Sequence, residues 1–186
     1  MAVQVLFSCA AELNPAIRAR LELAEQAGAA LMDESLWAEP EQLSEPLPDP
    51  AFNPPFTDRD PVYPAALARY GFHSGWEPWR SRLGGVRGRK INRLCEPGID
   101  ARLFRIEPGA SIPHHDHAAA ELTLVLQGGF SDHRGEYHRG DVCEGEAGIA
   151  HRPVGLAGEP CICFAVSLGG YRFRSPLMAI AARMLT

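Results

Sequence analysis

The sequence lacks any apolar run that approaches the roughly 18 consecutive residues needed to cross a membrane. It also lacks an excess of basic residues, because 18 Lys and Arg stand against 23 Asp and Glu, for a net charge of -5. A surface that grips nucleic-acid phosphates needs a basic patch, so this balance argues against direct nucleic-acid binding. We therefore expect neither a membrane protein nor a nucleic-acid-binding protein.

Cysteines are few, odd in number and widely spaced, which argues against a disulfide framework and is typical of a reducing cytoplasm. The five are Cys9, Cys95, Cys143, Cys161 and Cys163. The residues up to Cys9 have neither a basic start nor a full apolar core, so we expect no secretion signal and a cytoplasmic protein. Cys161 and Cys163 would share one face of a strand, where burial is a commoner role than metal binding or oxidation sensing.

An amphipathic helix is predicted over residues 14–36. Asn14 is a good N-cap, and Pro15 suits the first helical position. Apolar residues then recur at helical spacing, with charged residues off that stripe. A single helix cannot bury its own apolar face, so it must dock on the rest of the chain, on a second copy or on another protein. Docking within the chain or a dimer is the favoured interpretation.

Residues 38–64 contain half of the prolines of the chain and six acidic residues. Proline removes backbone donors and stiffens the chain, so this stretch predicts an extended linker. We therefore divide the chain into an N-terminal helical segment (1–37), an acidic proline-rich linker (38–64) and a C-terminal domain (65–186). Within that domain, residues 80–93 are the most basic; a charged strand edge is the favoured explanation, and binding of an anion or acidic partner is the alternative.

From Ile99 onward the pattern is one of short strands separated by turns. Strands are predicted over residues 101–106, 122–127 and 161–166, with a hairpin that turns at Gly135 and a short apolar helix over residues 175–184. In the second strand, Leu122, Leu124 and Leu126 face away from Thr123 and Val125, so both faces need burial. A second sheet, a second subunit or the N-terminal arm would cover the leucines, and a homodimer is one expectation.

Histidines and a carboxylate gather in one short stretch. His115 and His117 are two residues apart and Glu121 follows four residues later, so one extended strand would aim all three at the same face. His151 arrives later, behind a glycine-containing turn. Three nitrogens and one oxygen make a plausible four-coordinate site for a divalent metal, so the pattern predicts a metal centre. His114 has the opposite parity and should point away from it.

The same residues carry a family resemblance. Residues 109–128 match the first cupin motif, G-x5-H-x-H-x3-E-x6-G, at every fixed position, and residues 140–151 resemble the second motif, with Glu146 in place of its proline. The resemblance implies a mainly β protein, a cupin double-stranded β-barrel of the jelly-roll kind. It also implies a metal inside the barrel, held by His115, His117, Glu121 and His151.

More narrowly, the chain resembles the cupin half of ChrR-type zinc-binding anti-sigma factors. The likeness rests on residues 124–132, 135–137, 140–141, 151–153 and the Cys161-Ile-Cys163 stretch. It implies a stress-responsive regulator with an extracytoplasmic-function sigma factor as partner. In that family a small N-terminal helical domain holds the sigma factor around a second zinc site, His-x3-Cys-x2-Cys. This chain has no Cys-x2-Cys, so we do not expect the second zinc site, and residues 14–33 resemble only the last helix of that domain.

Two functions follow. In the first, a regulatory cupin uses four protein ligands to fill a tetrahedral zinc shell. In the second, a cupin enzyme of the dioxygenase or isomerase type holds Fe²⁺, Mn²⁺ or Ni²⁺ at higher coordination with open positions for a small-molecule substrate. No base or nucleophile stands out beyond the metal ligands, which favours the non-enzymatic reading.

Overall fold

The computed structural model describes residues 1–27, 63–70, 72, 81–169 and 171–173. Within these ranges the chain is mainly β, as predicted. The helices are α1 (Ala2–Leu13), α2 (Pro15–Ala27), α3 (Ala65–Ala68) and the 3-10 helix η3 (Asn92–Leu94). The strands are β1 (Ser81–Leu83), β2 (Val86–Lys90), β3 (Ile99–Ile106), β4 (His115–His117), β5 (Glu121–Gln127), β6 (Gly129–Ser131), β7 (Glu136–His138), β8 (Val142–Gly145), β9 (Val154–Gly155), β10 (Cys161–Leu168) and β11 (Tyr171–Phe173).

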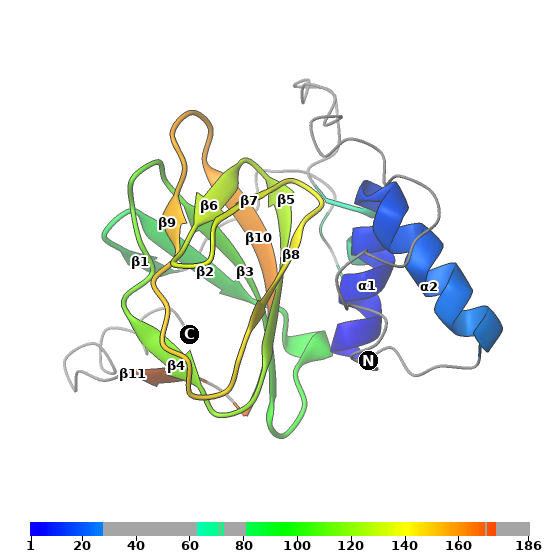
Figure 1. Ribbon diagram of the computed structural model, residues 1–186. Coiled ribbons are helices and arrows are strands. Elements are labelled where there is room, and N and C mark those ends of the chain that lie inside the picture. Colours follow the sequence, from blue (N-terminus) through cyan, green and yellow to red (C-terminus); the bar gives the residue numbers. More distant parts are fainter. Residues whose placement is uncertain (28–62, 71, 73–80, 170, 174–186) are drawn as a thin grey trace.

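The strands form a six-stranded sheet in the order β1-β2-β3-β10-β5-β8, a two-stranded sheet β11-β4 and a three-stranded sheet β7-β6-β9. The pairs that join these strands are antiparallel. Together they curl around one interior, with the helices α1 and α2 to one side (Figure 1). The predicted strands and the β6–β7 hairpin are confirmed, and Gly135 at its turn has a φ of 154°. The predicted helix over residues 175–184 lies outside the described residues.

The long strand β5 separates two apolar clusters. Its outer face carries Leu122, Leu124 and Leu126, which lie in the same buried cluster as Leu6 and Phe7 of α1. Its inner face carries Thr123 and Val125, and Val125 belongs to the cluster inside the barrel. The predicted alternation is therefore confirmed, and the N-terminal arm covers the leucines. Because α1 already covers these leucines, their burial does not require a second subunit. The homodimer stays a prediction, and the outer leucines no longer support it.

Helix α1 was not predicted as a separate element. One face of α1 packs against the barrel, because Leu6, Phe7, Cys9 and Ala10 are buried in the cluster that contains the outer leucines of β5. The next helix begins at Pro15 as predicted, because the Asn14 Oδ1 accepts hydrogen bonds from the backbone N–H groups of Ala16 and Ile17 at 3.0 and 3.4 Å. The prediction that the N-terminal segment offers one helix is thus wrong in number: two consecutive helices share one apolar cluster, because Ile17 and Leu21 of α2 pack against the buried residues of α1.

Much of the predicted linker lies outside the described residues. Its last residues, Tyr63 and Pro64, are described and buried. The backbone N–H of Ala65 donates to both carboxylate oxygens of Glu12 at 3.0 Å, which fastens the start of α3 to α1. The division at residues 37 and 64 stays a prediction. Among the described residues, no helix is both long and apolar enough to span a membrane.

Candidate metal centre

The four predicted ligands come from three separate segments. His115 and His117 lie on β4, Glu121 is the first residue of β5, and His151 precedes β9. The prediction that one strand presents the first three is wrong, because residues 118–120 interrupt it. Strand β4 pairs with β11, whereas β5 pairs with β10 and β8. The chain turns between the two strands and still brings the three side chains together.

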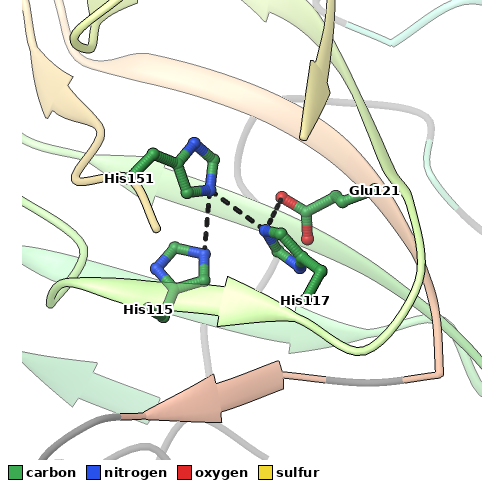
Figure 2. A group of neighbouring side chains, drawn as sticks. All are labelled: His115, His117, Glu121 and His151. Atoms are coloured by element: carbon green, nitrogen blue, oxygen red, sulfur yellow. Dashed lines mark hydrogen bonds and ion pairs between the residues drawn. The ribbon is translucent and has the colours of Figure 1, made fainter. Parts of the chain in front are cut away.

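The ligand atoms converge in the barrel interior, as Figure 2 shows. One donor atom from each residue lies within 4.8 Å of every other. The Nε2 atom of His151 is 3.1 Å from the Nε2 atoms of both His115 and His117, and the Nε2 atom of His117 is 3.8 Å from Glu121 Oε1. Two imidazole nitrogens on one tetrahedral zinc ion would be about 3.3 Å apart, given bonds of about 2.0–2.1 Å. The spacing therefore suits a single ion.

Hydrogen bonds at the Nδ1 atoms of His115 and His151 fix the tautomer of each ring, so that the Nε2 lone pair faces the candidate metal position. The Nδ1 atom of His115 is 2.8 Å from the carbonyl oxygen of Pro113, which can only accept, so Nδ1 carries the proton. The Nδ1 atom of His151 is 3.3 Å from Asp132 Oδ2 and donates in the same way. The two Nε2 lone pairs then face each other at 3.1 Å. That arrangement is repulsive unless a cation lies between them, so the donor set fits a metal ion.

The protonation states agree with this assignment. Burial, together with the neighbouring His151, lowers the pKa of His115 to about 3. Burial also lowers the pKa of His151, although the hydrogen bond to Asp132 opposes the shift. Both imidazoles are therefore neutral near pH 7, which is the form that binds a metal. All four ligands are buried, with exposed fractions from 0% for His117 to 6% for His151.

Two residues that sequence reasoning missed shape the site. Asp132 has a side chain only 1% exposed and fixes the ring of His151. Little in the sequence indicated this role, because Asp132 was singled out only as part of residues 124–132, which resemble the ChrR family. Gly145 lies opposite Glu121 on β8, and a Cβ there would come within 3.2 Å of His117 Nε2. Glycine at this position keeps the donor atoms uncovered, and no sequence pattern marked it.

The carboxylate of Glu121 is also held from its own strand. The hydroxyl of Thr123, the next residue on the inner face of β5, donates to Glu121 Oε1 at 3.2 Å. A small cavity of about 20 Å³ adjoins the site; three of the ligands, His115, Glu121 and His151, line it together with mostly apolar side chains. This volume has room for about one water-sized molecule.

The remaining candidates lie apart from the centre. His133 and His138 are exposed, and so is His114, which was expected to point away from the centre. Cys161 and Cys163 are buried on the inner face of β10, also as predicted, and Cys163 lines the small cavity. Its neighbour Cys161 and burial raise the pKa of Cys163 well above its usual value. A protonated, buried thiol is a poor nucleophile, so the structure favours the packing role of this pair over oxidation sensing.

Comparisons with known proteins agree with this geometry. Residues 69–169 match the family model described as the ChrR cupin-like domain. The anti-sigma-E factor ChrR of Cereibacter sphaeroides is 38% identical over 152 residues, which cover 81% of this chain and 69% of that protein. The fold is similar to a chain in the crystal structure of Rhodobacter sphaeroides SigE in complex with the anti-sigma ChrR, with a TM-score of 0.54 and 28% identity.

That structural match covers 90% of this chain and 97% of the other, so it extends past the barrel to the N-terminal helices. The fold, the buried His₃Glu group and the sequence identity lead to one assignment. This chain belongs to the ChrR cupin-like family and is a homologue of the ChrR anti-sigma factor.

Proposed function

We propose that this protein is a metal-dependent transcriptional regulator that binds an extracytoplasmic-function sigma factor and holds a zinc ion in its barrel. The homologue's name and the match to a sigma–anti-sigma complex support the partner. The buried His₃Glu group supports the metal, and four protein ligands of this kind suit a tetrahedral zinc ion. The protein would work in the cytoplasm, where such a sigma factor meets RNA polymerase.

The observation that carries the proposal is that one sheet joins the metal centre to the helical arm. Strand β5 begins with the ligand Glu121 on its inner face, and the leucines on its outer face pack against α1. A change at the centre that moves β5 therefore acts directly on the surface that holds α1. Packed interfaces respond to small shifts by changing between discrete arrangements, which is the property a sensor needs.

When bound, the zinc ion would tie three separate segments to one point, namely β4, β5 and the residues before β9. His115, His117 and His151 would supply neutral imidazoles, and Glu121 would supply the charged oxygen. Pro113, Asp132 and Thr123 would hold these ligands in orientation through the hydrogen bonds described above. Loss of the ion would leave two facing lone pairs in the interior and favour their separation.

The size of the adjoining cavity supports a regulator over an enzyme. Its volume of about 20 Å³ is far below the roughly 300 Å³ or more of a typical small-molecule site. The iron, manganese or nickel enzyme considered above would need space beside the metal for its substrate. A molecule no larger than water fits beside these ligands, which suits a small signal better than a substrate.

The test is co-purification. The full-length protein is co-expressed with a tagged extracytoplasmic-function sigma factor from the same organism, and the isolated complex is analysed for metal. We expect a stable complex with about one zinc per chain, and Glu121→Ala should change both metal content and sigma release. The proposal is wrong if the zinc-loaded protein binds none of the organism's sigma factors of this class. Iron or manganese in a complex that still forms would overturn only the choice of metal.

A further inference from the structure

Ser167 is a buried polar side chain to which the metal centre described above gives no role. Its residue is 0% exposed, and its hydroxyl has no hydrogen-bond partner among the residues that the structure describes. A hydroxyl that is buried without a partner costs free energy, so most buried hydroxyls are paired. The hydroxyl of Ser167 therefore points to an interaction that this side chain can make with a group beside it.

The register of the large sheet puts Ser167 directly beside a candidate metal ligand. Strands β10 and β5 are antiparallel, and Ser167 is the pairing partner of Glu121. Cys163 and Ala165 of β10 line the small cavity inside the barrel, and Ser167 continues the same face two residues further on. The Cβ atoms of directly opposite residues lie about 4.5–5.5 Å apart, so the serine hydroxyl can reach the glutamate carboxylate.

The two carboxylate oxygens of Glu121 have different surroundings. Oε1 accepts a hydrogen bond from Thr123 and lies 3.8 Å from Nε2 of His117, so this oxygen is on the side of the other candidate ligands (Figure 2). Oε2 is the second oxygen and is also buried. An ionised carboxylate offers about four lone-pair sites, so it can accept from Ser167 in addition to the contacts that it already makes.

A second carboxylate also neighbours Ser167, but its oxygens are held elsewhere. Asp100 is the pairing partner of Ser167 on β3. Its two oxygens accept from Nε and Nη2 of Arg102 at 2.6 and 2.8 Å, and Lys90 lies 3.5 Å from one of them. An oxygen that turned toward Ser167 would break this two-point, charge-assisted pair. Glu121 is therefore the acceptor that the geometry favours.

We propose that Ser167 is a positioning residue for the metal, whose hydroxyl donates to Glu121 Oε2 and leaves Oε1 for the ion. This inference rests on the zinc site of the proposed function. A carboxylate held at one oxygen binds the ion through the other oxygen alone, so three imidazoles and one oxygen complete a tetrahedral shell. Without the hydroxyl, both oxygens can turn toward the ion. Ser167 thus favours zinc over metals that prefer more ligands.

Metal binding by the full-length Ser167→Ala protein tests this inference. Competition with a chromophoric chelator should show zinc affinity about 10- to 100-fold weaker than in the wild type. Co²⁺ serves as a spectroscopic probe, because four-coordinate Co²⁺ absorbs visible light more strongly than Co²⁺ with five or six ligands. We expect Ser167→Ala to weaken this absorption. In a Glu121→Ala background Ser167→Ala should cause no further loss of affinity, since the hydroxyl acts through the carboxylate.

The matched control is Cys161→Ala, which truncates a buried side chain on the same face of β10, about 20 Å away along the strand, and should leave affinity and spectrum unchanged. Urea unfolding of chelated Ser167→Ala should show stability equal to the wild type or higher, because an unpaired hydroxyl is removed. Wild-type affinity and spectrum in Ser167→Ala, or an undiminished loss in the Glu121→Ala background, would overturn only the role of Ser167. A wild-type protein that binds no metal would overturn the zinc site itself, and this inference with it.

Discussion

His115 and His151 are direct neighbours across a β-bridge and exchange two backbone hydrogen bonds, with N to O distances of 3.2 and 2.9 Å. The backbone thus holds two of the candidate metal ligands side by side although 35 residues separate them in the sequence. Their Nε2 atoms meet at 3.1 Å. A site whose ligands are positioned by main-chain pairing is largely preorganised in the folded chain, so an ion that binds there would stabilise the fold.

Removal of the metal should lower the melting temperature. A ligand present at about 1,000 times its Kd stabilises the native state by about 4 kcal/mol, which corresponds to a shift of roughly 10 °C for a chain of this size. Differential scanning calorimetry with and without a chelator measures the shift, and elemental analysis gives the metal content. His115→Ala should abolish the chelator effect, whereas His133→Ala, at an exposed position, should keep it. Equal melting temperatures with and without metal would refute this prediction.

Asp132→Asn should weaken metal binding by about 10- to 100-fold, because the amide holds the ring of His151 less firmly than the carboxylate does. A competition titration with a chromophoric chelator measures the affinity. Asp141→Asn is the matched control, since Asp141 Oδ2 accepts a hydrogen bond from the backbone of His138 and touches no ligand. Equal affinities for the two variants would show that Asp132 does not position His151.

Gly145→Ala should reduce metal affinity more than it reduces the stability of the metal-free protein. The added methyl group would lie 3.1–3.2 Å from the His117 ring, which is closer than ordinary carbon contacts and forces the ring to move. The backbone at Gly145 does not have a positive φ, so alanine can adopt the same backbone conformation. Chelator competition and urea unfolding of the metal-free protein separate the two effects. A variant with unchanged metal affinity would contradict the prediction.

Leu6→Ala should destabilise the protein by about 2–5 kcal/mol. Leu6 is fully buried between α1 and the outer face of the large sheet, so truncation leaves a cavity there. Gln4→Ala, at an exposed position of the same helix, should change the stability by less than about 0.5 kcal/mol. Equilibrium urea unfolding compares the two variants. A small effect of Leu6→Ala would mean that α1 is not docked on the barrel in solution.

The Asp100–Arg102 pair should make stability depend on acid pH. Burial acts to raise the pKa of Asp100, but hydrogen bonding and charge from Arg102 outweigh it and hold the pKa below 3.8. The folded state therefore favours the carboxylate, and its contribution is present above the unfolded pKa and is lost as pH falls through the folded one. Asp100→Asn should destabilise the protein by about 1–2 kcal/mol at pH 7. The difference from the wild type, measured on chelated protein, should shrink below about pH 3.8; a constant difference would contradict this.

The sequence by itself picked out the four residues that meet in the candidate metal centre and indicated the class of the fold. Two histidines and a glutamate at fixed short spacings, followed by a fourth ligand behind a turn, are local features that a linear pattern records. The alternation along residues 122–127 likewise separated an inner from an outer face. The two-residue period of the extended chain accounts for the pairing of His115 with His117 and for the two faces of residues 122–127, whereas the spacing of the cupin motifs indicated the fold class, Glu121 and His151.

Only the tertiary structure decided what surrounds these features. It broke the predicted single strand at residues 118–120, put α1 over the outer leucines, and brought Asp132 and Gly145 against the ligands. Such contacts join residues far apart in the chain, and they depend on how strands pair and curl around the interior. No local period encodes that pairing, because its energy comes from burial shared across the whole barrel.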